Sequence, residues 1–278
     1  MSDIHIVVDS TANLPAAVLA ANPNLHVVPL KVMLGETAWS EQELTNAELF
    51  RLAREKGMHP RTSQPSPGDF ARAFEPAAAG QPVIMISLAG GLSGTVDGAR
   101  AAAREYKGGE IHIVDSGTAA TGVVKLTETA LAMAAEKEPP AAIAGRLQEL
   151  AAATRTLFIP DSLEYLHKGG RIGGAAALFG SILQITPILH LHEGRVQVLD
   201  KVRTKTRALE RMLAELEKRG ELAYIGVAHG ELATAAESAY HTICQRYPNI
   251  PVSLNPISPV LSAHLGPGVV GLIFQSKV

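Results

Sequence analysis

The sequence predicts an α/β protein of two domains: a mostly parallel sheet flanked by helices, followed by a second α/β domain with a mixed sheet. Short apolar runs alternate with helical segments rich in Ala, Leu, Glu and Arg, which is typical of a parallel sheet with helices on its faces. This alternation changes after about residue 155, where two apolar runs flank His192-Glu193-Gly194 in the manner of a β-hairpin. We therefore expect an N-terminal domain of residues 1–155 and a C-terminal domain of residues 156–278.

The strands expected in the first domain are followed by polar residues. These strands are Ile4–Val8, Val27–Met33, Val83–Ser87 and Ile111–Val114, and a segment with helical character follows each. Asp9 comes directly after the first strand and Asp115 directly after the last, each with hydroxyl residues beside it. In open α/β sheets this edge is where ligands bind. We expect Asp9 and Asp115 to support the edge by accepting hydrogen bonds from backbone amides.

The later elements are predicted from the same kinds of pattern. Two alanine-rich helices are expected to meet at Pro139-Pro140. In the second domain we expect strands Thr186–Leu191 and Arg195–Lys201, helix Thr204–Arg219, strand Ala223–Val227, a further helix, and a final strand Val269–Phe274.

Composition excludes several classes of partner and site. Of the 278 residues, 46% are hydrophobic and 19% are charged, so we expect a buried core rather than a disordered chain. Aromatic residues make up 4% and the net charge is −2, which argues against a nucleic-acid-binding surface. Cys244 is the only cysteine, so we expect neither an internal disulfide nor a zinc site built from thiolates.

A soluble, cytoplasmic protein is expected. From Met1 the chain runs into an apolar strand without the basic flank and long apolar stretch of a signal peptide. The most membrane-like stretch, Ala175 to Leu191, is interrupted by Gly180, Gln184 and Pro187, whereas a spanning helix needs about 20 mostly apolar residues. We interpret this stretch as a buried helix followed by a strand.

The segment Arg61–Phe70 combines a helix start with two further hydroxyl groups. Ser66 followed by Pro67 predicts an N-cap and the first residue of a helix. Thr62 and Ser63 have no part in that cap. Hydroxyls in the loop before a helix N-terminus can donate to an anion that the free backbone amides also attract. The alternative is a turn with ordinary capping hydroxyls.

A second candidate is the glycine-rich turn around Ser93, which follows an expected strand and precedes an expected helix. Gly90, Gly91 and Gly94 permit a close backbone approach to a ligand at the helix start. A nucleophilic serine occupies a similar elbow in hydrolases, with the pattern G-x-S-x-G. Here Thr95 replaces the last glycine, and the lysine of a phosphate-binding P-loop is absent. A binding loop is favoured over a nucleophile.

Arg171 and His264 are the remaining candidates. Arg171 lies among glycines after a short helix, where it would meet an anion or a partner's carboxylate, or would cap the helix. His264 precedes Gly266-Pro267-Gly268, which predicts a tight loop, and its ring can donate to a carboxylate. His190 and His192 share one face of an expected strand, but a hairpin explains them, and we assign no metal site.

Together these segments resemble the DegV family, whose characterised members are fatty-acid-binding subunits of bacterial fatty acid kinase. Each segment is a weak signal alone, whereas their order and spacing are specific. The resemblance extends over nearly the whole chain, through Val8–Pro15, Thr62–Ser66, Ser93–Thr95, Val114–Ser116, Leu163–Leu166, Gly170–Gly173 and His264–Gly268.

The resemblance implies a fatty acid bound between and within the two domains, with its carboxylate held by Thr62, Ser93 and His264. Supporting positions are Ser63, Gly94, Thr95 and Gly266. It further implies that the chain has no cofactor and no catalysis of its own. A separate ATP-dependent kinase would convert the presented carboxylate into an acyl phosphate for phospholipid synthesis. Arg171 and a basic run are the implied contacts to that kinase: Lys201, Arg203, Lys205 and Arg207. For Lys205 and Arg207 a solvated helix start explains the charges equally well.

A tunnel for the acyl tail is expected from apolar residues of the second domain, although core packing alone would also explain each of them. These residues are Leu163, Leu166, Ala175–Phe179, Ile182, Leu183 and Ile188. Two other functions stay open at this point. One is a serine hydrolase that uses Ser93 and His264, and the other is a subunit that binds a small phosphorylated metabolite.

Overall fold

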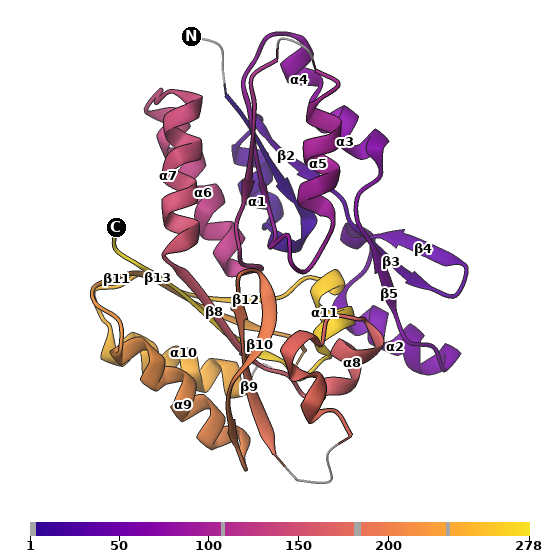
Figure 1. Ribbon diagram of the computed structural model, residues 1–278, viewed down its shortest axis with the longest axis vertical. Helices are drawn as coiled ribbons and strands as arrows, with labels where there is room; N and C mark the ends of the chain where they lie inside the picture. Colours follow the sequence, from indigo (N-terminus) through magenta and orange to yellow (C-terminus); the bar gives the residue numbers. More distant parts are fainter. Residues whose placement is uncertain (1–3, 107–108, 181–184, 232–233) are drawn as a thin grey trace.

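The computed structural model describes residues 4–106, 109–180, 185–231 and 234–278. Its first sheet is parallel throughout and has the strand order β2–β1–β6–β7. Figure 1 shows this sheet in the upper half of the molecule, above a second, larger sheet. The strands are β1 (His5–Asp9), β2 (Leu25–Val28), β6 (Val83–Ser87) and β7 (Ile111–Asp115). The predicted parallel sheet is therefore confirmed.

Helices cover both faces of this parallel sheet. Successive residues of a strand point to opposite faces, so Ile84 and Ile86 pack with one set of helices and Val83 and Met85 with the other. The first set is α1 (Ala16–Ala21), α6 (Thr121–Ala135) and α7 (Pro140–Ala152). The second set is α3 (Pro67–Ala73), α4 (Glu75–Ala78) and α5 (Thr95–Ala103). Because both faces are buried, the strands read as nearly continuous apolar runs.

The second sheet is mixed, as predicted, with the order β10–β9–β8–β13–β11–β12. Only β11 and β12 pair in parallel among its described strands. Its strands are β8 (Thr154–Ile159), β9 (Thr186–His192), β10 (Arg195–Val202), β11 (Leu222–His229), β12 (Val252–Pro256) and β13 (Val270–Ser276). The expected hairpin is β9–β10, and the chain enters this sheet at Thr154.

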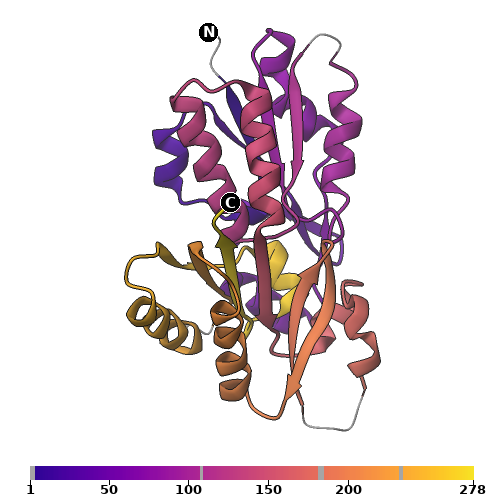
Figure 2. The same ribbon diagram turned by 60° about the vertical axis from the view of Figure 1, so that its left-hand side comes forward.

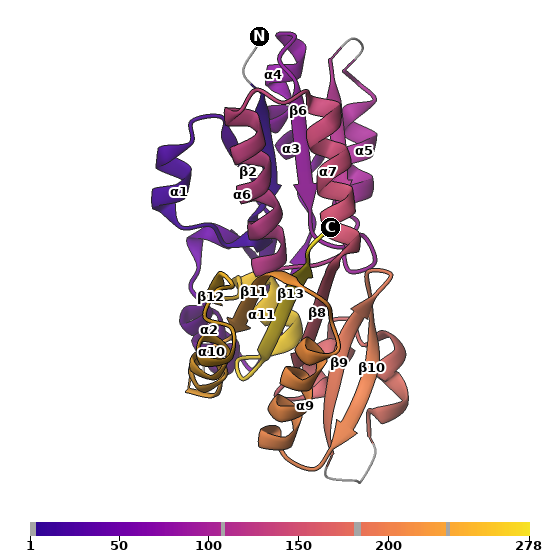
Figure 3. The same ribbon diagram turned by 90° about the vertical axis from the view of Figure 1, so that its left-hand side faces the viewer.

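The two faces of the mixed sheet have different neighbours. Helices α9 (Lys205–Glu217) and α10 (Thr234–Arg246) pack on the outer face, which Figure 2 and Figure 3 show in side view. The inner face packs with α8 (Leu163–Lys168), with α11 (Pro259–Leu265) and with Ala119–Ala120, which lead into α6. Apolar side chains of both halves of the chain therefore meet on the inner face.

A third sheet, not predicted, lies beside these two. It is antiparallel, with the order β4–β3–β5, and consists of β3 (Lys31–Leu34), β4 (Thr37–Ser40) and β5 (Arg61–Ser63). The single strand predicted at Val27–Met33 was wrong, because Pro29 and Leu30 separate β2 from β3. Proline has no amide to donate to a strand ladder, and the amide of Leu30 donates instead to Ser10 Oγ at 2.9 Å.

Helix α11 is the element that this third sheet positions. Val32 and Leu34 of β3 pack in one buried cluster with Val260 and Ala263 of α11. Helix α2 (Asn46–Lys56) contributes Leu49 to the same cluster. The short 3-10 helix η2 (Glu41–Glu43) lies between β4 and α2 in the chain. Segments about 200 residues apart in the chain are thus packed together.

Residues 181–184 of the stretch Ala175 to Leu191 lie outside the described residues, and the part before them differs from the predicted buried helix. It forms a short 3-10 helix, η3 (Gly173–Leu178), of which only Ala175 is buried, and the side chain of Phe179 is 41% exposed. Gly173 and Gly180 adopt positive φ angles of 49° and 78°, which end regular helix geometry at both sides. The strand that follows is β9. Across the described ranges, we find no helix with both the length and the apolar character needed to cross a bilayer.

The polar edge of the parallel sheet is built as predicted. Asp9 is fully buried and accepts hydrogen bonds from the amides of Thr11, at 3.0 Å, and of Leu88, at 2.6 Å. Asp115 accepts from the amides of Gly90 and Gly117. Both carboxylates thereby tie the loops after β6 and β7 to the sheet edge.

Candidate functional site

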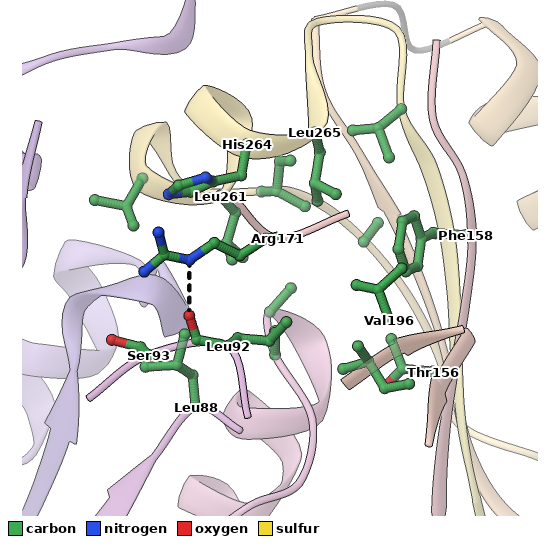
Figure 4. A pocket seen from close by; sticks show the side chains of 18 of the residues that line it. Leu88, Leu92, Ser93, Thr156, Phe158, Arg171, Val196, Leu261, His264 and Leu265 are labelled. Carbon is green, nitrogen blue, oxygen red and sulfur yellow. Dashed lines mark hydrogen bonds between the residues drawn. The ribbon is translucent and has the colours of Figure 1, made fainter. Parts of the chain in front are cut away.

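A cavity lies between the polar edge of the parallel sheet and the inner face of the mixed sheet. We call it the interdomain cavity. Its volume is about 970 Å³, counting the part open to solvent. Residues from β5, the loop after β6, β8, β13 and α11 line it. Figure 4 shows His264, Arg171 and Ser93 gathered at one end, and Phe158 and Val196 away from them.

The three residues predicted to hold the carboxylate, Thr62, Ser93 and His264, all line this cavity. Thr62 and His264 are in direct contact, since Thr62 Oγ1 lies 2.7 Å from His264 Nε2. Ser93 lines the same end, although its hydroxyl contacts Thr95 Oγ1 at 2.8 Å. The structure therefore brings together side chains from β5, from the turn before α5 and from α11.

The local structure of two of these residues differs from the expectation. Thr62 lies in the short strand β5 rather than in a loop, and only the residues after Ser63 lead into the capped start of α3. Ser66 caps α3 as predicted, with Asp69 completing a capping box. His264 lies in the last turn of α11, and the tight turn with Gly266 at φ 81° follows it. The ring is thus held by a helix rather than by a loop.

His264 is electrically neutral near pH 7. Burial and, to a smaller extent, the positive charge of Arg171 lower the pKa of its imidazole from 6.5 to about 4. Its Nδ1 is buried and has no hydrogen-bond partner among the described residues. A neutral ring with one nitrogen in contact with Thr62 can hold a polar ligand but is a weak base.

Arg171 lies in the cavity wall, a place that sequence reasoning did not assign to it. Its Nε donates to Leu92 O at 3.0 Å and its Nη1 to Gly169 O at 2.7 Å. These bonds fix the guanidinium beside Ser93 and His264, as Figure 4 shows. A fixed positive charge next to hydroxyl and imidazole groups favours an anionic ligand at this end.

Apart from Thr156, the rest of the cavity is lined mainly by apolar residues, and this lining only partly matches the tunnel that we expected. Of the predicted tail residues, Leu166 lines the cavity, whereas Ile188 is packed in the core on the outer face. Ala175–Phe179 and Leu163 are not part of the lining, and residues 182 and 183 lie outside the described residues. The apolar lining includes Leu88, Leu92, Phe158, Leu191, Val196, Ala228, Leu261, Leu265 and Ile273. Gly271 and Ile273 of β13 line the cavity at alternate positions of the strand, and this period of two was the signal that the sequence offered.

The supporting positions are distributed around the polar end. Ser63 and Gly94 line the cavity, and Thr95 is buried at the start of α5. Gly266 lies against the ring of Tyr165 instead. Gln64, which sequence reasoning passed over, also lines the cavity and packs against Gly94. Arg203 is exposed and does not line the cavity. Within the described ranges, no three His, Cys, Asp or Glu side chains are grouped so as to hold a metal ion.

Replacing Gly169 with alanine is expected to displace the His264 ring. A β-carbon at Gly169 would lie 2.2 Å from His264 Nδ1, while the φ of Gly169, −78°, suits alanine. The clash is therefore with the imidazole and not with the backbone conformation. We expect the affinity of a carboxylate ligand to fall by about tenfold, the value of one hydrogen bond to a charged group. Titration calorimetry with the purified variant measures this loss.

Gly145→Ala is the matched control for this experiment. Gly145 lies within α7, and a β-carbon there would have no neighbour within 4 Å. This variant should bind ligand normally and unfold at a slightly higher temperature, because alanine favours a helix by about 1 kcal/mol over glycine. Unchanged affinity in Gly169→Ala would show that the ligand does not depend on His264.

Comparison with known proteins places the chain in one family along its whole length. The family model described as "Uncharacterised protein, DegV family" matches residues 3–277. A DegV domain-containing protein of Listeria innocua is 34% identical over 282 residues, covering 99% of each chain. A DegV domain-containing protein of Streptomyces coelicolor is 34% identical over 283 residues, again with 99% of each covered.

Solved structures agree in fold and in family. A DegV family protein from Thermus thermophilus, described with its fatty acid binding, superposes with a TM-score of 0.90 at 32% identity over the full length of both chains. DegV from Bacillus subtilis, described as a fatty acid binding protein, gives a TM-score of 0.89 at 27% identity, also over both full lengths. The shared sequence model, the identity over both lengths and the common fold lead to one conclusion: this chain is a member of the DegV family.

Proposed function

We propose that the protein binds a long-chain fatty acid in the interdomain cavity, with the carboxylate at the polar end. The observation that supports this most directly is the division of one cavity into a polar end with a fixed positive charge and an apolar remainder. The T. thermophilus and B. subtilis relatives, which are described as binding fatty acids, support the same ligand. No cofactor is needed for this role.

The acyl tail supplies most of the binding free energy in this proposal. Burying one methylene group contributes about 0.8 kcal/mol, so a long chain offers on the order of 10 kcal/mol before the cost of association. A hydrogen bond to a charged group contributes about 1.5–3 kcal/mol. Thr62, Ser93 and His264 therefore chiefly orient the head group, while the apolar lining sets the affinity.

We further propose that the bound carboxylate is presented to a separate ATP-dependent kinase. A carboxylate oxygen attacks the γ-phosphorus of ATP on the kinase, the bond from that phosphorus to the bridging oxygen breaks, and ADP leaves with the electron pair. The products are an acyl phosphate and ADP, and no proton has to be removed. A site without a strong base fits this reaction, since the pKa of His264 is lowered to about 4. Such a kinase uses cytoplasmic ATP, so we place the protein in the cytoplasm.

The serine hydrolase alternative has little support in the geometry. A nucleophilic serine needs a base within hydrogen-bond reach. His264 Nε2 contacts Thr62 Oγ1 instead, and Ser93 Oγ contacts Thr95 Oγ1. With its lowered pKa, His264 would also accept the serine proton poorly. A fluorophosphonate probe that labels Ser93 would reverse this judgement in favour of a hydrolase.

The ligand is tested by denaturing the purified protein and analysing its organic extract by mass spectrometry. We expect long-chain fatty acids in the extract, in a ratio to protein approaching one, because tails of this length dissociate slowly. The delipidated protein should then take up added palmitate. An empty protein that also fails to bind palmitate would refute the proposed ligand.

Replacing Ser93 with alanine should affect phosphorylation more than binding. The tail contacts remain and one hydrogen bond to the carboxylate is lost, so we expect palmitate affinity to fall by about tenfold. Acyl phosphate formation by a partner kinase should fall by about 100-fold or more, because the carboxylate is no longer held in one orientation. Ser238→Ala, at an exposed position of α10, is the control. Equal losses in both assays would contradict the separate roles of head group and tail.

A further inference from the structure

A second opening, next to the polar end of the interdomain cavity, has no role in binding a simple carboxylate. We call it the arginine cleft. It comprises about 770 Å³, counting the part open to solvent, and is lined by Gly90–Gly94, Gly170, Arg171, Gly173, Arg195 and Val196. Leu92, Ser93, Gly94, Arg171 and Val196 line both the cleft and the cavity. A group attached to a carboxylate held at Ser93 would therefore enter this cleft.

The cleft carries positive charge that no carboxylate of the described residues neutralises. Among the described residues, neither Arg171 nor Arg195 forms an ion pair. Arg171 uses Nε and Nη1 on the carbonyls of Leu92 and Gly169, which leaves its Nη2 without a protein partner in the described ranges. Asp115 borders the glycine turn, but its carboxylate accepts hydrogen bonds from the amides of Gly90 and Gly117. The two guanidinium groups remain available to an anion.

The backbone holds Arg195 in place at this cleft. The turn of the β9–β10 hairpin touches the glycine turn so closely that a β-carbon at Gly91 would lie 2.4 Å from Gly194 O and 2.9 Å from Arg195 Cγ. On the other side, a β-carbon at Gly173 would lie 2.4 Å from Val196 O. Glycines at both contacts thus allow three backbone segments to pack closely: the glycine turn, the turn of the β9–β10 hairpin and the segment at Gly173. Arg195 lies at this junction.

We propose that the arginine cleft binds the phosphoryl group of an acyl phosphate whose chain occupies the interdomain cavity, with Arg195 as a specificity-determining residue. Guanidinium groups bind phosphate through paired, charge-assisted hydrogen bonds, and a phosphoryl dianion gains more from a second arginine than a carboxylate does. Arg171 lines both the cavity end that would hold the carboxylate and the cleft that would hold the phosphoryl group. Arg195 lines only the cleft. This inference rests on the proposed function, because it assumes that an acyl chain occupies the cavity.

The test compares two ligands that share the same chain. One is palmitate, and the other is a β-ketophosphonate analogue of palmitoyl phosphate in which a methylene replaces the bridging oxygen. Affinities are measured for the delipidated wild type, for Arg195→Gln and for Lys201→Gln. Lys201 is exposed on the same strand β10 and does not line the cleft, so its replacement removes an equal charge outside the cleft.

We expect Arg195→Gln to lower the affinity of the phosphonate by about tenfold and that of palmitate by less than twofold. Lys201→Gln should change neither by more than twofold. The loss should shrink at high salt, because Arg195 is exposed and its charge is screened. An equal effect on both ligands, or no effect on the phosphonate, would overturn the inference while leaving fatty acid binding in place. Inorganic phosphate is a second probe, added to the wild type loaded with palmitate. If phosphate binds there but does not compete with the phosphonate, the phosphate site is not the phosphoryl site, and this result would also overturn the inference.

A failure of the proposed function gives a different result. In that case neither palmitate nor the phosphonate binds to the wild type, and the inference falls with it. Tight binding of the phosphonate with dependence on Arg195, but without any binding of palmitate, would support the cleft and refute the fatty acid as the resting ligand.

Discussion

Gly271→Phe is expected to lower the affinity for palmitate on the order of 100-fold. Gly271 lies in β13 opposite Phe158 of β8 and Ala228 of β11, and all three line the interdomain cavity. A β-carbon there makes ordinary contacts, 3.4 Å from Ala228 Cβ, so the backbone accepts a side chain. The phenyl ring then occupies space that the acyl tail would fill. Displacing about four methylene groups removes roughly 3 kcal/mol of binding free energy.

Octanoate provides the internal control for this prediction. We expect a short chain that starts from the same polar end to avoid the added ring, because Gly271 pairs with Phe158, which Figure 4 shows on the side of the cavity away from the polar groups. We expect Gly271→Phe to bind octanoate within about threefold of the wild type. A thermal unfolding curve confirms that the variant is folded. Equal losses for both chain lengths, or none for palmitate, would show that the tail runs elsewhere.

Glu41→Gln is expected to make the stability of the protein less dependent on pH. The carboxyl group of Glu41 is 2% exposed and accepts hydrogen bonds from Ser10 Oγ and, at 2.7 Å, from the amide of Val260 in α11. Burial raises its pKa from 4.5 to about 7, against the opposing effect of these hydrogen bonds. The pKa of the neighbouring Asp9 is also raised by burial, and Asp9 is present in both proteins.

The direction of the effect follows from proton binding. Between pH 4.5 and about 7 the folded protein retains a proton on Glu41 that the unfolded chain has released, so the free energy of unfolding falls as pH rises. The stabilisation is complete below pH 4.5 and lost above about pH 7, and it amounts to roughly 3 kcal/mol. Glutamine keeps an acceptor for Val260 and does not titrate.

Urea unfolding at several pH values measures this difference. From pH 4.5 to 8, we expect the Gln variant to gain roughly 3 kcal/mol relative to the wild type. Glu43→Gln is the control, since Glu43 caps its own short helix at the surface, where a carboxylate remains hydrated. A constant difference between wild type and Glu41→Gln across this pH range would show that Glu41 is already ionised in the folded protein.

The sheets and helices that form the main layers of the fold were predictable, because each element depends on a pattern among residues that are close in the sequence. Buried parallel strands such as Val83–Ser87 require continuous apolar runs, and the hairpin Thr186–Val202 requires turn residues between two runs. Asp9 and Asp115 could be placed at the sheet edge because a strand's end is visible in the sequence. The third sheet was missed because its strands are three or four residues long, too short to show a period of their own.

The sequence alone determined the α/β class, the parallel sheet followed by a mixed sheet, and the polar residues after the strands, since all of these depend on local periodicity and turn chemistry. Residue patterns made Thr62, Ser93 and His264 candidates for binding an anion, and only the family resemblance joined them in one site for the carboxylate of a fatty acid. The tertiary structure decided that Thr62 contacts His264, that Arg171 faces the cavity and that Arg195 meets the glycine turn. Those contacts join residues up to 202 positions apart, and only the packing of α11 on the third sheet and of the hairpin on Gly91 brings them together.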